Sequence, residues 1–176
     1  MRIAAALLFA LYFFLSQPLW FAGAVVVAAL TVPFDRRRRW LHLYTCLWGG
    51  HYALLMPGWR LRVRGRAHIR PGEVYVLVAN HQSHVDTLVL FTLFCHFKWV
   101  AKQEVFRVPF IGWNMTMNDY VALRRGDPGS IAAMLRACRA HLEAGSSVML
   151  FPEGTRSPDG RMRGFKHGAF SLAAEA

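Results

Sequence analysis

The first part of the chain is a long apolar stretch that carries no charge. No Asp, Glu, Lys or Arg occurs between Ile3 and Phe34. A helix over residues 3–30 would be about 42 Å long, more than the roughly 30 Å hydrocarbon core of a bilayer. This length favours a membrane anchor over a cleaved signal peptide, whose apolar part is shorter. Because Pro18 lies near the middle, three arrangements are open: one kinked and tilted span, a re-entrant hairpin, or a helix pair partly within one leaflet.

A basic and aromatic segment follows this stretch directly. Residues 35–70 contain nine Arg and one Asp, four of the arginines being consecutive, which gives a local charge of +8. Such a cluster beside an apolar span marks the cytoplasmic side and attracts anionic headgroups. Trp40, Tyr44 and Trp48 are typical of a helix at the membrane interface. A solvated basic face and a nucleic-acid-binding patch are therefore less favoured. We expect a membrane location with an anionic surface as a partner, no nucleic acid, and the rest of the chain on the cytoplasmic face.

From residue 58 onward, short apolar runs alternate with segments of helical periodicity. This alternation predicts an α/β fold with a mixed, largely parallel sheet flanked by helices. Two parts are expected: an N-terminal anchor with its basic segment over residues 1–57, and a globular domain over residues 58–176. The expected strands are Trp59–Arg64 (half-exposed), Val74–Ala79 (buried on both faces), Phe97–Ala101, Tyr120–Leu123 and Ser147–Phe151. The expected helices are Asp86–Phe94, Asp127–Gly145 (with Asp127 as N-cap and Pro128 in the first turn) and Lys166–Glu175.

Composition narrows the class of protein further. With 176 residues, 55% hydrophobic, the chain has room for one domain and an appendage, and it is too apolar for a disordered protein. The 21 basic and 10 acidic residues give a net charge of +11, which suggests an anionic partner or a phosphorylated substrate. The cysteines at 46, 95 and 138 show no metal-ligand spacing, and we expect reduced thiols without a disulfide framework.

Two expected strands are each followed by an unusually polar loop. The first polar loop, residues 80–86, places His81 five residues before Asp86, which begins the predicted helix. In such a dyad the carboxylate orients the imidazole, which accepts a proton from a hydroxyl that attacks a carbonyl. A simple helix-capping role for this pair is the alternative.

The second polar loop, residues 152–157, contains Glu153, Gly154, Thr155 and Arg156. Exposed backbone N–H groups beside a guanidinium can cradle a phosphate, although an ordinary polar turn would have the same composition. Neither loop contains a cysteine, a GxSxG motif or a set of metal ligands. We therefore expect direct transfer without a covalent intermediate, with no metal and no cofactor.

Taken together, the two loops carry a specific resemblance. The string NHQSHVD at residues 80–86, with FPEGTRS about seventy residues later, resembles the glycerolipid acyltransferase family typified by 1-acylglycerol-3-phosphate acyltransferase. Further blocks match at residues 100–104, 109–113, 120–125 and 165–170. The resemblance covers roughly residues 58–176.

This resemblance implies transfer of a fatty acyl group from acyl-CoA or acyl carrier protein to the hydroxyl of a lysophospholipid, in phospholipid biosynthesis. His81 would be the general base and Asp86 its orienting partner; His84 is also close to Asp86 in sequence, but His81 occupies the family's position.

The second polar loop would shape the acceptor site. The implied substrate-binding residues are Glu153, Gly154, Thr155, Arg156, Arg125, Arg124 and Lys102. The acceptor phosphate would meet Arg156 or Arg125, with Lys102 as a weaker candidate. Arg124 stands where the family often has an acid, so the choice between Arg124 and Arg125 stays open.

Two alternatives accompany this interpretation. The acceptor could instead be glycerol 3-phosphate or a lyso-aminolipid, since nothing in the sequence fixes it. The chain stops inside the last predicted helix, where members of the family continue into another core strand, so we expect either a fragment or an acyltransferase domain truncated at its C-terminus. The chain could also be an inactive, membrane-bound remnant that binds lipid without turnover.

Overall fold

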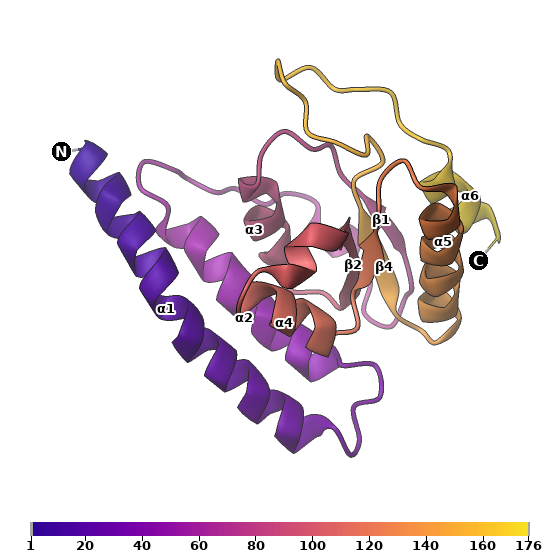
Figure 1. The fold of residues 1–176 in the computed structure, drawn as a ribbon, viewed down its shortest axis with the longest axis horizontal. Coiled ribbons are helices and arrows are strands. Elements are labelled where there is room, and N and C mark those ends of the chain that lie inside the picture. Colours follow the sequence, from indigo (N-terminus) through magenta and orange to yellow (C-terminus); the bar gives the residue numbers. More distant parts are fainter. Residues whose placement is uncertain (1, 176) are drawn as a thin grey trace. The chain divides into compact units, whose positions relative to one another are not determined.

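The computed structural model describes residues 2–175, which form two compact units (Figure 1). The first unit contains residues 2–69 and 84–95, and the second contains residues 70–83 and 96–175. The chain therefore passes from one unit to the other more than once. The division expected after residue 57 stays a prediction.

The first unit is helical, and its longest element is one continuous helix. Helix α1 (Arg2–Thr31) runs through Pro18 without a break, so among the three open arrangements the two that divide the stretch into two helices do not apply. Proline removes one N–H from a helix and disturbs the preceding turn. Here Ser16 and Gln17 both donate side-chain hydrogen bonds to the Phe13 carbonyl, at 3.3 and 2.7 Å, in the turn before the proline. Two polar side chains of α1 thus find an acceptor within the helix itself, as an apolar solvent would require.

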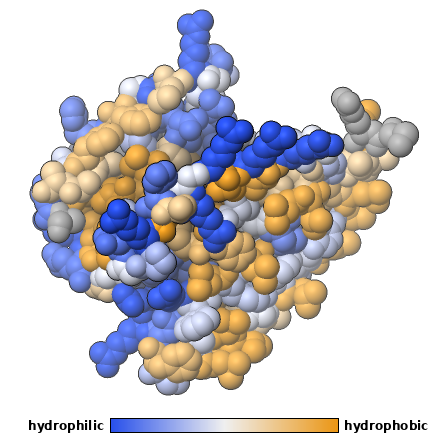
Figure 2. Space-filling model, turned by 180° about the vertical axis from the view of Figure 1, so that it is seen from behind, coloured by the Kyte–Doolittle hydropathy of each residue, from blue (hydrophilic) through white to orange (hydrophobic). Residues whose placement is uncertain are grey.

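Helix α1 directs its polar groups towards α2 (Arg39–Leu55). The Tyr52 hydroxyl lies 2.6 Å from Ser16 Oγ and accepts a hydrogen bond from Gln17 Nε2 at 3.0 Å. Tyr44 donates to the Trp20 carbonyl at 3.0 Å. The apolar side chains of α1 are instead exposed, and Figure 2 shows hydrophobic side chains gathered over this helix. Among the described residues, α1 is the one helix long and apolar enough to cross a membrane, a property that signal sequences share.

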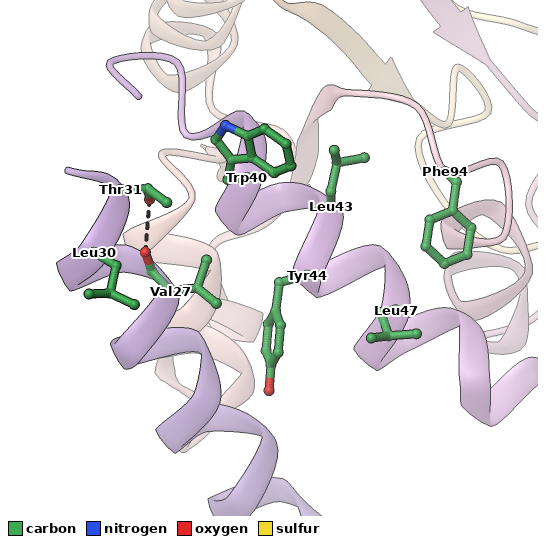
Figure 3. A pocket seen from close by; sticks show the side chains of 8 residues that line it. All are labelled: Val27, Leu30, Thr31, Trp40, Leu43, Tyr44, Leu47 and Phe94. Carbon is green, nitrogen blue, oxygen red and sulfur yellow. Dashed lines mark hydrogen bonds between the residues drawn. The ribbon is translucent and has the colours of Figure 1, made fainter. Parts of the chain in front are cut away.

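An apolar hollow lies between α1 and α2. It measures about 370 Å³, and its lining includes Val27 and Leu30 from α1 and Trp40, Leu43 and Leu47 from α2 (Figure 3). In the connection from α1 to α2, the buried Asp35 accepts hydrogen bonds from the backbone N–H groups of Arg39 and Trp40 at 2.9 and 2.7 Å. The one acid of the basic segment therefore satisfies the free amides at the start of α2.

A glycine notch on α2 receives the short helix α3 (Val85–Phe91). A Cβ atom at Gly49 would lie 2.2 Å from the Phe91 ring, whereas one at Gly50 would meet Thr92 Cγ2 at an ordinary 3.4 Å. His42 of α2 is buried, and its Nε2 atom is 3.0 Å from the carbonyl oxygen of Cys95, which follows the end of α3. The unit also contains the 3-10 helix η1 (Arg66–His68).

The second unit contains a four-stranded sheet in the order β1-β4-β2-β3, and its paired strands are all parallel. The strands are β1 (Val76–Val78), β2 (Phe97–Lys102), β3 (Val121–Leu123) and β4 (Ser147–Leu150). Figure 1 shows α5 (Pro128–Glu143) and α6 (Gly168–Glu175) together beside this sheet. Two short helices, η2 (Gln103–Arg107) and α4 (Ile111–Met117), connect β2 to β3. The core consists of Val100, Val121, Met134, Cys138, Leu142, Val148, Leu150, Ala169 and Leu172.

The predicted α/β fold is confirmed, with corrections at particular elements. Residues 59–64 form no strand, contrary to the prediction. They belong to the first unit, whose described elements are all helices, so no neighbouring strand is present for backbone hydrogen bonding. The strand expected at Val74–Ala79 is shorter and lies at the sheet edge, where Val78 is exposed, so it is not buried on both faces. Strand β4, expected at Ser147–Phe151, is instead the strand whose residues are all buried. The sequence reading did not identify α4.

Helix α5 has the predicted start and stop. The Asp127 side chain accepts a hydrogen bond from the Ser130 N–H at 3.1 Å, and Pro128 occupies the first turn. At its other end Gly145 has a φ of +79°, a left-handed conformation that favours glycine. This helix covers β3 and β4.

The notch on α2 gives a test with an internal control. Gly49→Ala should destabilise the chain by about 1–3 kcal/mol, because the new methyl group overlaps the Phe91 ring. Gly50→Ala, one residue further on, should be neutral or stabilise by up to about 1 kcal/mol, since alanine is the better helix former and its Cβ would make only ordinary contacts with Thr92. Denaturant unfolding in detergent micelles measures both. Equal effects at the two glycines would contradict the notch.

Candidate functional site

The imidazole of His81 rests on an aromatic support within the second unit. Its ring stacks on Phe151 with the centroids 4.0 Å apart and the planes inclined by 11°. Phe151 follows β4 and stacks in turn on Trp99 of β2, at 5.5 Å and 30°. With 8% of its surface exposed, His81 is buried. Three segments that are remote in sequence thus set the plane of this ring.

Glu153 fixes the main chain of the same histidine. Its carboxylate is buried, with 4% of the residue's surface exposed. Oε1 accepts a hydrogen bond from the His81 N–H at 2.6 Å, and Oε2 accepts one from the Arg163 N–H at 2.9 Å. A buried carboxylate is costly unless its oxygens are paired, and here each has a backbone donor. The residue therefore joins the first polar loop, the second polar loop and the segment around residue 163.

Further hydrogen bonds connect these loops. The Ser157 N–H donates to the His81 carbonyl at 2.9 Å, and Gln82 Nε2 donates to the Gly160 carbonyl at 3.0 Å. Asp159 Oδ1 accepts from the Ser157 hydroxyl and from the Arg161 N–H. Both bonds lower the pKa of Asp159, and the one from the Arg161 amide has the larger effect. The two polar loops thus form one hydrogen-bonded structure.

The turn of the second polar loop needs a glycine at one position. The Gly154 N–H donates to the Phe151 carbonyl at 3.0 Å, and Gly154 has a φ of +71°. A side chain in this conformation costs about 1–2 kcal/mol. A Cβ atom would in addition lie 2.9 Å from Lys166 Nζ. The positive φ of the turn therefore favours glycine here, and the end of the Lys166 side chain occupies the space that a Cβ atom would need.

Two of the other predicted binding residues, Arg124 and Lys102, already have partners within the protein. Arg124 is engaged: its Nε donates to Gln103 Oε1 at 3.2 Å, and its guanidinium pairs with Asp127 at 3.4 Å. Lys102 forms an exposed ion pair with Glu104 at 3.1 Å. The pKa of Glu104 is lowered, by its own backbone N–H first and by Lys102 second.

Two predicted arginines have free guanidinium groups. Arg125 and Arg156 are exposed, and among residues 2–175 their side chains form no hydrogen bond or ion pair. Thr155 is half-buried between Gly154 and Arg156. Arg125 and Arg156 are therefore available to a substrate phosphate, whereas Arg124 is already paired.

Asp86 lies in the first turn of α3, as the sequence predicts. It is half-buried and belongs to the first unit, whereas His81 belongs to the second. The roles of Asp86 as orienting partner and of His81 as base stay predictions. His84, the competing histidine, is exposed and directly precedes α3. In the described part of the chain, no three His, Cys, Asp or Glu side chains form a group that could hold a metal ion.

The sequence reading missed the residues that support the predicted base. The sequence places Phe151 and Trp99 only in strands and Lys166 only at the start of the last helix, and it gives no role to the backbone of Arg163. A usable signal was present, because Phe151 is the last apolar residue before the second polar loop. Side chains at the carboxyl ends of neighbouring parallel strands meet at one edge of the sheet.

Comparison with known proteins gives consistent matches. The Acyltransferase family model matches residues 60–176. A 1-acyl-sn-glycerol-3-phosphate acyltransferase of Chlamydomonas reinhardtii is 42% identical over 177 residues, which is 99% of this chain and 52% of that protein. One of Pseudomonas aeruginosa is 32% identical over 146 residues, 82% of this chain and 56% of that protein. The chain thus spans about half the length of these curated relatives.

A solved structure is also similar. The crystal structure of the 1-acyl-sn-glycerophosphate (LPA) acyltransferase PlsC from Thermotoga maritima superposes with a TM-score of 0.75 at 26% identity. The match covers 99% of this chain and 71% of that one.

Glu153 offers a test of how the two loops are joined. In Glu153→Gln one carboxylate oxygen becomes an NH₂ group, so one of the two backbone N–H donors loses its acceptor at a cost of about 1–3 kcal/mol. Amide hydrogen exchange at His81 or Arg163 should become about tenfold faster or more. Glu143→Gln makes the same chemical change on the exposed face of α5 and should leave both amides unaffected. Unchanged exchange in Glu153→Gln would show that the carboxylate does not hold the loops.

Proposed function

The chain belongs to the Acyltransferase family, and from this we propose that it is an O-acyltransferase acting in phospholipid biosynthesis. In the proposed reaction a fatty acyl group moves from acyl-CoA or acyl carrier protein to the hydroxyl of 1-acylglycerol 3-phosphate. The observation that carries the proposal is the Glu153 carboxylate, which holds the main chain of His81. It joins the two polar loops whose motifs carry the family resemblance.

His81 would act as a general base. Its imidazole accepts the proton of the acceptor hydroxyl, and the hydroxyl oxygen attacks the thioester carbonyl. The new C–O ester bond forms, the C–S bond breaks, and the departing thiolate takes up a proton. The stacked, buried ring supports this role, because a base must be held in a fixed orientation towards the hydroxyl.

Direct transfer is the better supported route. Cys138, the cysteine of the second unit, is buried in the core, and burial raises its pKa to about 12. A thiol of this kind is a poor nucleophile, because the thiolate is the reactive form. We propose that Asp86, at the start of α3, orients the His81 imidazole and stabilises its protonated form.

The acceptor is proposed to carry a phosphate. Arg125 and Arg156 have free guanidinium groups, which bind phosphate oxygens through paired N–H donors. Arg124 is paired with Asp127, which favours Arg125 at this position. The relatives compared above are named for 1-acyl-sn-glycerol 3-phosphate, which favours this acceptor over glycerol 3-phosphate and over a lyso-aminolipid.

We further propose that α1 holds the chain in a membrane. Its polar side chains meet α2, while Leu7, Leu11 and Leu15 are more than half exposed. Such an arrangement suits an apolar solvent, in which polar groups must find partners within the protein. The arginines after α1 favour the cytoplasmic face for the remaining chain.

Replacement of the proposed base tests the mechanism. His81→Ala should lower the rate of acyl transfer at least about 10²–10⁴-fold, the usual contribution of a general base. Asp86→Asn should also abolish most of the activity, since its amide cannot stabilise an imidazolium. Transfer of a labelled acyl group to 1-acylglycerol 3-phosphate measures the rate.

His84→Ala is the matched control, since it removes an exposed imidazole from the same loop and should retain near-normal turnover. Circular dichroism and membrane sedimentation should show all three variants folded and membrane-associated. Near-normal turnover of purified His81→Ala would reject the assignment.

Membrane attachment can be tested separately. The full chain should stay in the membrane pellet when cells are extracted with alkaline carbonate. Leu11→Asp combined with Leu15→Asp should shift it into the extract, because each charge costs about 2.5–3.5 kcal/mol in the apolar core of a bilayer. Recovery of the unmodified chain in the carbonate extract would contradict the anchor.

A further inference from the structure

Lys166 lies across the turn of the second polar loop. A Cβ atom built on Gly154 would be 2.9 Å from Lys166 Nζ, 3.0 Å from Cε and 3.5 Å from Cδ. The end of the lysine side chain therefore lies over the bare Cα of Gly154. The Lys166 N–H also donates to the Pro152 carbonyl at 2.9 Å, which holds its main chain beside the same turn.

The ammonium group of Lys166 has no acidic partner. Within residues 2–175 its side chain forms no hydrogen bond or ion pair. Glu153, the acid beside Gly154, uses both carboxylate oxygens for backbone amides. Lys166 is exposed, and a positive charge that no acid neutralises favours an anionic ligand.

The same turn also supports the proposed base. Phe151 begins it and lies under the His81 imidazole, and Gly154 ends it under the Lys166 ammonium. In 1-acylglycerol 3-phosphate the free hydroxyl and the phosphate are on neighbouring carbons. The ring that supports the proposed base and the residue beside the lysine are thus three positions apart on one short turn, and a substrate with a hydroxyl next to a phosphate suits such an arrangement.

We propose that Lys166 binds a substrate phosphate, as a further binding residue of the acyl-transfer site. The inference rests on the proposed function and adds a residue to it. The phosphate belongs either to the acceptor or to the nucleotide of acyl-CoA, since both are dianionic phosphate groups.

Two substitutions separate the charge of Lys166 from its packing. Lys166→Met keeps an unbranched stem over Gly154 and removes the charge, whereas Lys166→Arg keeps the charge. If the ammonium binds phosphate, Lys166→Met should raise the KM for the phosphate-bearing substrate about tenfold or more, the effect of one charged hydrogen bond. Lys166→Arg should retain most of the affinity. Arg136→Met, on the exposed face of α5, makes the same charge change and should leave both KM values unchanged.

The source of the phosphate is identified by changing the donor. With acyl-pantetheine, which lacks the nucleotide, a persisting rise in the acceptor KM places Lys166 on the acceptor phosphate. A rise in the KM for acyl-CoA that disappears with acyl-pantetheine places it on the donor. Unchanged KM values in Lys166→Met, or equal losses of kcat alone in Lys166→Met and Lys166→Arg, would overturn the proposal.

Equilibrium binding separates this inference from the proposed function. Two probes need no turnover: 1-acylpropanediol 3-phosphate, which lacks the accepting hydroxyl, and CoA. Isothermal titration in detergent micelles should show one of them binding the full wild-type chain about tenfold more tightly than Lys166→Met. If the wild-type chain binds a probe more tightly in this way but transfers no acyl group, the proposed function is refuted, while the role of Lys166 in phosphate binding is supported. If each probe binds Lys166→Met as tightly as it binds the wild-type chain, the proposal that Lys166 binds a substrate phosphate is refuted.

Discussion

The carboxylate of Glu153 is buried and accepts hydrogen bonds from two backbone amides that are far apart in the sequence, those of His81 and Arg163. Both oxygens must be paired for the burial to be tolerated, so the two amides are held where the carboxylate needs them. Phe151, two residues earlier, supports the His81 ring. The position of the proposed base, in backbone and in side chain, therefore depends on this one short turn after β4.

Acidic and basic residues have different tasks in this chain. Asp35, Asp127, Glu153 and Asp159 each accept hydrogen bonds from backbone amides, at the starts of helices or in the loops of the site. The chain has 10 acidic and 21 basic residues, so most of its positive charge has no acid to neutralise it. Lys98 is an exception among the basic residues, since it is buried and donates to the Asn118 carbonyl. A surface with this excess of cations suits anionic lipids and phosphorylated substrates.

Local patterns predicted much of the fold but little of the support of the site. The capping signals of Asp127 and Pro128 identify α5, because they act within one turn of the chain. The alternation at residues 59–64 was misleading, since a strand also needs a neighbour, which periodicity does not reveal. Glu153 could be selected from its motif, but its two backbone partners come from other segments and follow only from the tertiary structure. The same holds for Lys166, whose contact with Gly154 depends on the path of the loop.

The most direct test of the account is thiol release by the full chain in micelles, with acyl-CoA as donor and a panel of acceptors. With 1-acylglycerol 3-phosphate, the account predicts that one thiol is released for each molecule of diacyl product formed. With 1-acylpropanediol 3-phosphate, it predicts only background release. Absence of release with every acceptor, or equal release with and without an acceptor hydroxyl, would contradict it.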